Sequence, residues 1–120
     1  MACIKTILNF QNELRLHHWG TQSYSAHQAL GAAYEAIDDL LDTFTESYVG
    51  VYGRSEIYEI KELKFNGPDQ ISPEKVLESF EEYLIKNIVN EIDSDQTALL
   101  NIRDEILGTV QKTKYLLTLK

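Results

Sequence analysis

Two histidines and two carboxylates in the first half of the chain have types and spacings suited to metal binding. His18 precedes His27 by nine residues, and Asp42 and Glu46 follow, four residues apart. Carboxylates at i and i+4 project from one face of a helix, one turn apart, where they repel each other. A bound cation would reverse that repulsion, and a mixed set of imidazole and carboxylate ligands suits iron(II) or manganese.

Each of these features also has a simpler structural interpretation. An acidic stripe on a helix is commonly a solvated face, and a histidine on an apolar seam is commonly a core or interface residue. His17 points roughly 100° away from the seam that contains His18, which predicts a solvated side chain. Cys3, the single cysteine, is expected to be a small apolar residue near a helix start rather than a reactive thiol.

The carboxylates belong to a predicted helix with three different sides. Its apolar seam is formed by His27, Leu30, Tyr34, Ile37, Leu41, Phe44 and Tyr48. A second side is acidic, with Glu35, Asp38, Asp39, Asp42 and Glu46. The third side carries the small residues Ala29, Ala32, Ala33 and Ala36. Because small residues permit close approach, we expect this helix to pack both within its own domain and against a second copy.

Four helices are expected to position these residues. The first runs from about Ile4 to Trp19 and stops at Gly20. The second begins after Ser25, which forms a capping box with Gln28, and ends before Gly50. The third starts at Ser72-Pro73-Glu74, and the fourth follows the Asp93-Ser94-Asp95 cluster. Between the second and third helices, residues 56–65 fit a short helix or an extended segment equally well.

The lengths of the connections predict the topology. The first and last connections are only a few residues long, so each joins an antiparallel pair of helices. The middle connection, of about twenty residues, is long enough to cross the length of a bundle. We therefore predict an all-α, antiparallel four-helix bundle, ferritin-like, as a single domain over residues 1–120, with a long crossover between the second and third helices.

Three short motifs resemble the Dps family of mini-ferritins. They are Leu16-His17-His18-Trp19, Ser25-Ala26-His27 and Asp42-Thr43-Phe44-Thr45-Glu46, so the match is strongest over residues 1–48. The resemblance implies a ferroxidase-type site between subunits, with His18 and His27 from one chain and Asp42 and Glu46 from its two-fold partner. Iron would be the cofactor and the stored cargo. The sequence departs from the family at Gly31, where a further acidic ligand is expected, and in lacking basic tails.

Charge and composition limit the partners. The net charge is −8 and no basic run is present, so direct binding to DNA is not expected. No apolar stretch is long enough to cross a membrane, and residues 1–5 lack the features of a signal peptide. A single cysteine fits a cytoplasmic setting. The interface implied for the second helix predicts a homo-oligomer, at least a two-fold dimer.

Two other functions remain open from the sequence. A helical assembly or interaction protein that has lost the metal site would explain Gly31 and the missing tails equally well. A nucleotide pyrophosphohydrolase would use paired acids such as Glu78 with Glu81 or Glu35 with Asp38. All three histidines precede residue 28, which excludes a di-iron centre built from Glu-x-x-His motifs on two helices of one bundle.

Overall fold

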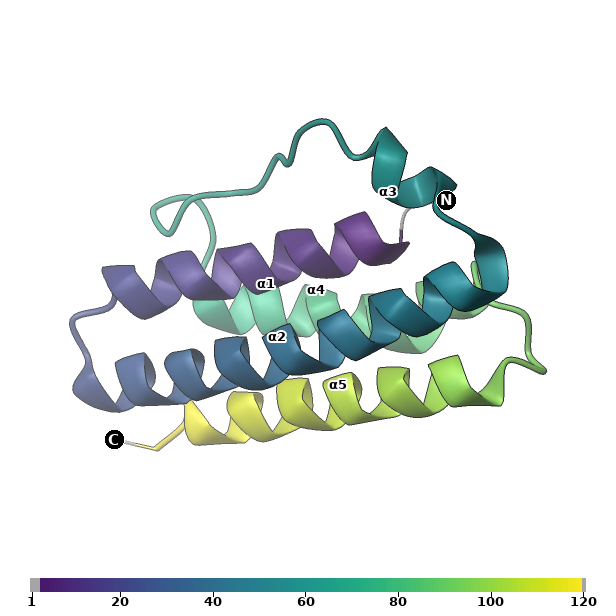
Figure 1. Ribbon diagram of the computed structural model, residues 1–120. Coiled ribbons are helices and arrows are strands. Elements are labelled where there is room, and N and C mark those ends of the chain that lie inside the picture. Colours follow the sequence, from purple (N-terminus) through teal and green to yellow (C-terminus); the bar gives the residue numbers. More distant parts are fainter. Residues whose placement is uncertain (1–2, 120) are drawn as a thin grey trace.

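The computed structural model describes residues 3–119, which form helices and loops without a β-strand (Figure 1). The elements are α1 (Cys3–Gly20), α2 (Tyr24–Tyr52), α3 (Ser55–Glu59), α4 (Pro73–Glu82), a π-helical turn η1 (Tyr83–Asn87), a 3-10 turn η2 (Ile88–Asn90) and α5 (Thr97–Leu116). The all-α prediction is confirmed. None of the helices in this range is both long and apolar enough to span a membrane.

The second helix differs from its prediction at both ends. It begins two residues early because Ser23, not Ser25, is the cap: the Ser23 hydroxyl accepts a hydrogen bond of 3.2 Å from the backbone N–H of Ala26. It also continues past Gly50, because the ring contacts from Phe44 to Tyr48 go on to Tyr52. The helix ends at Gly53, whose φ of 88° is readily adopted only by glycine.

The third helix begins as predicted but does not stay regular. Ser72 caps it by accepting a hydrogen bond of 3.1 Å from the N–H of Lys75, and Pro73 occupies the first turn. After Glu82 the helix widens into η1 and then tightens into η2. The last helix starts at Thr97, close to the predicted position.

The four long helices pack in a ring of pairwise contacts. α1 contacts α2 and α4, and α5 contacts the same two helices. α1 and α5 run in one direction, and α2 and α4 run in the other (Figure 1). The interior is filled by large apolar side chains with less than 2% exposure, including Ile7, Leu14, Leu30, Ile37, Phe44, Leu77, Phe80, Leu84, Ile88, Leu99 and Ile106.

A buried carboxylate attaches the start of the crossover to the start of α1. Residues 55–59 form the short helix α3, and the chain then runs without regular structure to residue 66. Glu56, on α3, accepts hydrogen bonds of 2.8 and 3.1 Å from the backbone N–H groups of Ile4 and Lys5. These N–H groups have no partner within α1, so Glu56 caps the helix from a distance in sequence. Cys3 is fully buried beside it, as expected.

The rest of the crossover lies along α1 and covers His17. Glu13, 7% exposed, accepts a hydrogen bond of 2.8 Å from the backbone N–H of Asn66. His17 is only 5% exposed and donates a hydrogen bond to the backbone carbonyl of Ile71. The prediction that His17 is solvated was therefore wrong. The angle from the apolar seam was read correctly, but that side of α1 faces the returning crossover rather than solvent.

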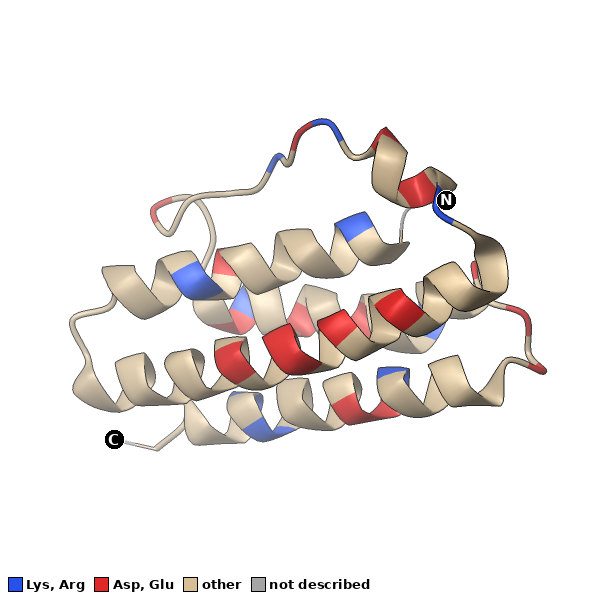
Figure 2. Ribbon diagram, in the orientation of Figure 1, with Lys and Arg blue, Asp and Glu red and all other residues tan. Residues whose placement is uncertain are grey.

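Acidic residues gather along the outward side of α2 (Figure 2). Glu35, Asp38, Asp39, Asp42 and Glu46 are all exposed, as the sequence predicts. The predicted alanine side is divided: Ala29 and Ala33 are buried, whereas Ala32 is exposed and Ala36 is half-buried. Only Ala32 and Ala36 are thus available to permit close approach of another molecule.

Candidate functional site

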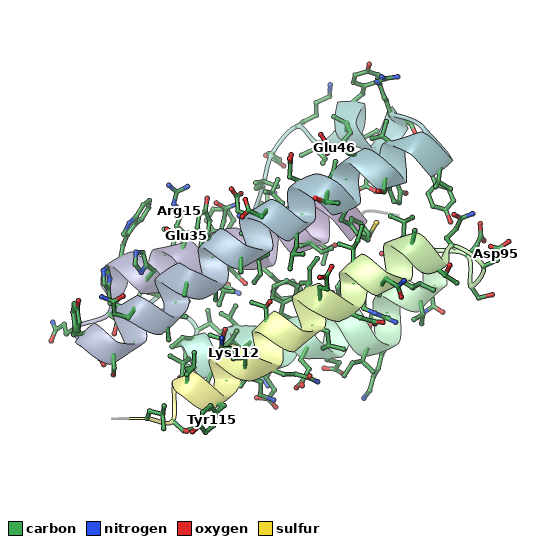
Figure 3. The ribbon with its side chains drawn as sticks, turned by 60° about the horizontal axis from the view of Figure 1, so that its bottom comes forward. Arg15, Glu35, Glu46, Asp95, Lys112 and Tyr115 are labelled. Carbon is green, nitrogen blue, oxygen red and sulfur yellow. The ribbon has the colours of Figure 1, made fainter. Side chains whose placement is uncertain are left out.

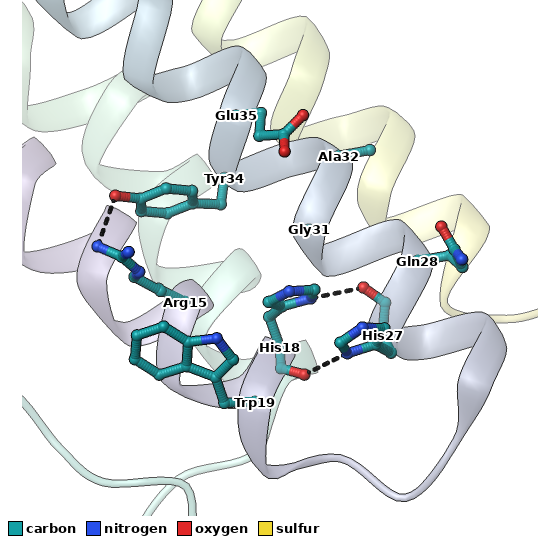
Figure 4. Close-up of a pocket in the computed structure, with 9 residues that line it drawn as sticks. All are labelled: Arg15, His18, Trp19, His27, Gln28, Gly31, Ala32, Tyr34 and Glu35. Atoms are coloured by element: carbon teal, nitrogen blue, oxygen red, sulfur yellow. Dashed lines mark hydrogen bonds between the residues drawn. The ribbon is translucent and has the colours of Figure 1, made fainter.

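His18 and His27 form a reciprocal pair between the end of α1 and the start of α2. Their rings stack with centroids 3.9 Å apart and planes inclined by 14°. The Nδ1 of each ring lies 2.7 Å from the backbone carbonyl oxygen of the other residue (Figure 4). A carbonyl only accepts hydrogen bonds, so each Nδ1 is the donor, and in the neutral ring the lone pair is on Nε2.

The glycine on α2 explains how the two rings fit together. A Cβ added at Gly31 would lie 2.6 Å from Cε1 and 2.9 Å from Nδ1 of His18, closer than real contacts allow. Any side chain at this position would displace the His18 ring. Glycine at position 31 therefore has a physical reason, which is the space that the His18 ring requires.

A pocket of about 360 Å³ surrounds the histidine pair (Figure 4). We call it the histidine pocket; it is lined by Arg15, His18, Trp19, His27, Gln28, Gly31, Ala32, Tyr34 and Glu35. The Arg15 guanidinium lies 4.7 Å from the ring centroids of both Trp19 and Tyr34, and it donates a hydrogen bond of 2.9 Å to the Tyr34 hydroxyl. Two aromatic faces therefore hold a cation at the edge of this pocket.

The predicted acidic ligands lie elsewhere on α2. Asp42 is fifteen residues beyond His27, which is about 22 Å along a helix. Glu46 is one helical turn further on, and Figure 3 shows it well beyond Glu35 along that helix. One chain thus brings His18 and His27 together and leaves Asp42 and Glu46 apart from them. Within residues 3–119, no three His, Cys, Asp or Glu side chains are grouped so as to hold a metal ion.

A second hollow, which we call the acidic groove, lies between α1, α2 and the segment around α3. It has a volume of about 660 Å³ and is lined by Ile4, Leu8, Gln11, Asp38, Asp39, Leu41, Asp42, Thr45, Ile57 and Ile60. Gln11 is 1% exposed and donates a hydrogen bond of 2.8 Å from its Nε2 to Asp38. Its Oε1 is buried without a hydrogen-bond partner in the described part of the chain. The sequence carried a signal for this site, because Gln11 interrupts the apolar seam of α1.

The acidic side of α2 is not neutralised within the described residues. Among residues 3–119, none of its five carboxylates forms an ion pair, although Asp38 accepts the hydrogen bond from Gln11. Carboxylates one turn apart repel by a few tenths of a kcal/mol per pair. The arrangement thus carries a small cost in the isolated chain, which a cationic partner would remove.

One of the acids considered for a pyrophosphohydrolase site, Glu81, has partners on another helix. Glu81 lies 2.7 Å from the ammonium of Lys114 on α5 and accepts a hydrogen bond of 3.1 Å from Gln111. The contact with Lys114 holds the pKa of Glu81 below its ordinary value. Glu81 is therefore engaged between α4 and α5, which disfavours a role with Glu78 in holding magnesium.

These features define an all-helical protein with a histidine pocket and an acidic groove on the α1–α2 face. The chain belongs to the DUF5856 family, described as a family of unknown function, whose profile matches residues 18–117. It is also similar to the uncharacterized 14.6 kDa protein in the mobD-ri intergenic region of Enterobacteria phage T4. The two are 29% identical over 107 residues, covering 86% of this chain and 75% of the phage protein. No solved structure matches the chain.

The family assignment corrects the resemblance to the Dps mini-ferritins. The match to DUF5856 covers most of the chain, whereas the Dps resemblance depended on three short motifs in the first 48 residues. The mini-ferritin and iron-storage assignments that this resemblance implied find no support in either match. The physical reason for the error is local: histidines beside a tight turn, followed by acids on a helix, are also explained by a hydrogen-bonded ring pair and an exposed acidic face. The predicted bundle topology does not depend on the resemblance, because it is inferred from the lengths of the connections.

Proposed function

We propose that this chain is a non-catalytic helical assembly protein that associates with a second copy through its α1–α2 face. The scaffold in this proposal is an antiparallel four-helix bundle with one long crossover. The ring of contacts among α1, α2, α4 and α5 supports it, as does the attachment of the crossover along α1. A bundle of this kind keeps α1 and α2 rigid, so their shared outer face is a suitable surface for association.

The observation that carries the proposal is the opposite chemistry of the two halves of this face. One half has Arg15 with a stacked histidine pair beside exposed aromatic rings, Trp19 being 62% exposed. The other half has unpaired carboxylates along α2, ending at Asp42 and Glu46. A surface with complementary halves is complementary to itself under a two-fold rotation.

In such a dimer, the histidine pocket of one copy faces the acidic half of the other. His18 and His27 would then lie opposite Asp42 and Glu46 of the second copy, with ionic and hydrogen-bond contacts as the attraction. The exposed Ala32 of α2, which lines the histidine pocket, allows the second copy to approach closely. Because Nδ1 of each ring donates within its own chain, a protonated His18 or His27 has its Nε2–H left to donate to a carboxylate of the second copy.

Sedimentation equilibrium is the direct test of this proposal. The expected result is a mass of twice the 13.8 kDa chain at micromolar concentrations, and a monomer at all concentrations would overturn the proposal. The double substitution Asp42→Lys with Glu46→Lys should weaken the dimer by about 100-fold, since like charges would then oppose each other. Glu78→Lys is the matched control, because Glu78 is exposed on α4, which is not a neighbour of α2 in the ring, and it should leave the mass unchanged.

The same surface charge argues against direct contact with DNA. Affinity for nucleic acid comes mainly from lysine and arginine near phosphates, and the net charge of this chain is −8. The outward side of α2 would repel a phosphate backbone. We therefore assign the α1–α2 face to a protein surface, with a second copy as the partner.

A further inference from the structure

Gln11 and Asp38 together form an acceptor site in the acidic groove. The Gln11 amide is 1% exposed, and its Nε2 donates 2.8 Å to Oδ1 of Asp38, which fixes the orientation of both groups. Gln11 Oε1 is buried and unpaired among the described residues. A buried oxygen without a partner is costly, and the Gln11 side chain that carries it lines the same groove as Asp38 and Asp42.

The chemistry of this site selects a cation with several N–H donors. An amide oxygen and a carboxylate are both acceptors, so an incoming hydroxyl or carboxylate would match them poorly. A guanidinium offers five N–H groups in a planar fork and contacts two acceptors at once. The apolar side chains of Leu8 and Leu41 in the same groove suit the methylene stem of an arginine.

We propose that Arg15 of a second copy is the occupant of this site; this inference rests on the dimer proposed above. Among residues 3–119, no carboxylate is ion-paired with Arg15, and its bond to Tyr34 uses one of the five N–H groups. The rings of Trp19 and Tyr34 hold its guanidinium on the α1–α2 face. Arg15 is therefore oriented before binding and retains donors for a carboxylate and an amide.

The positions along α2 are consistent with this pairing. Arg15 is hydrogen-bonded to Tyr34, and Asp38 lies one helical turn further along α2. A two-fold axis crossing α2 near Ala36, halfway between positions 34 and 38, would place Arg15 of each copy opposite Asp38 of the other. The same axis would place His27 opposite the stretch from Asp42 to Glu46. One axis thus serves both the arginine contact and the histidine contact.

Charge exchange between the two positions tests the pairing. Arg15→Glu alone and Asp38→Arg alone should each weaken the homodimer by about 100-fold, because each creates two repulsive contacts. A mixture of the two variants should form a heterodimer with affinity within about tenfold of the original, since both contacts are then attractive. Lys112→Glu, on α5, is the control for a reversed cation elsewhere and should leave the dimer unchanged.

Gln11→Leu separates an interface role from a structural role. It removes the buried oxygen, so we expect unchanged or higher stability of the isolated chain but roughly tenfold weaker association. A wild-type monomer would overturn the proposed function itself. A wild-type dimer that neither single reversal weakens, or that the mixed variants fail to restore, would overturn the Arg15 pairing and leave the dimer standing. Circular dichroism of each variant identifies any chain that has simply not folded.

Discussion

The two ends of α1 handle their polar groups in opposite ways. At the first end, which we call the closed end, Cys3, Glu56 and Tyr48 are packed together, and the Glu56 carboxylate satisfies two free N–H groups of the helix. At the second, the open end, His18 and His27 satisfy each other's carbonyls but border a pocket of about 360 Å³. The carboxylate and the N–H groups at the closed end are paired with each other inside the fold. The open end retains groups that can bind another molecule.

At the closed end, burial shifts the pKa values of two side chains. Burial, with a further contribution from Glu56, raises the pKa of the Cys3 thiol to about 12, so the thiol stays protonated and unreactive at neutral pH. Burial, together with the nearby Cys3 and Glu56, also raises the pKa of Tyr48. In this region a shifted pKa thus marks a side chain that packs in or against the core. The groups with capacity to bind lie on the α1–α2 face instead.

Replacing the capping carboxylate should produce the largest effect and would break the closed end. Glu56→Ala leaves the N–H groups of Ile4 and Lys5 without a partner at a buried helix start. We expect a loss of about 2–3 kcal/mol in the free energy of unfolding, measured by urea denaturation. The Cys3 thiol should also become accessible to alkylation in the folded variant.

Glu59→Ala is the matched control for that substitution. Glu59 is an exposed glutamate on the same short helix, so its removal should change the free energy of unfolding by less than about 0.5 kcal/mol. Equal losses from the two variants would mean that the effect comes from removing a negative charge from α3 and not from the hydrogen bonds to Ile4 and Lys5. In that case the distinction between the two ends of α1 would rest on burial alone.

The sequence predicts the helices well because apolar periodicity is a local signal. The first helix, the start of α4 at Ser72 and the long crossover all follow from patterns within a few residues. The closed end could not be predicted in this way. Glu56 lies 52 residues from Ile4, and in the sequence it resembles the exposed glutamates around it. Only the return of the crossover along α1 gives it a buried role.

Substituting Gly31 tests the packing of the histidine pair at the open end, and we expect an intermediate loss in the free energy of unfolding. Gly31→Ala places a Cβ 2.6 Å from Cε1 of His18, so the ring must move and both Nδ1 hydrogen bonds weaken. Gly108→Ala is the control, because a Cβ at this helical glycine meets nothing within 4 Å. Alanine at Gly108 should stabilise by about 0.5–1 kcal/mol, and the Gly31 variant should be less stable than that variant by about 1–2 kcal/mol.

The readout for the two glycine variants is urea denaturation combined with NMR of the imidazole signals. We expect the His18 and His27 resonances to shift in Gly31→Ala and to stay unchanged in Gly108→Ala. Equal stabilisation by both substitutions, with unchanged imidazole signals, would show that the ring pair does not depend on the space at Gly31.

The candidate site is only partly readable from sequence for a related reason. Helical angles correctly identified the acidic side of α2. They did not predict the stacking of His18 on His27, because the two residues lie on different helices. They missed Arg15, whose importance comes from two aromatic rings on different helices, and they did not single out Gln11. Both depend on which side chains meet between α1 and α2, and no single-helix pattern contains that information.

The smallest expected change in stability comes from His17. This residue lies near the open end of α1, on the side that the crossover covers. Burial lowers the pKa of His17 below its ordinary value of 6.5, and its Nε2 is buried without a partner among the described residues. The unfolded chain therefore binds more protons than the folded chain once the pH falls below about 6.5. Stability should be fully present above that pH and decline as the pH falls further.

Unfolding free energies measured from pH 7.5 to 5.5 should show this decline in the original chain and a weaker one in His17→Gln. Identical pH profiles for the two would mean that the crossover leaves His17 accessible to water.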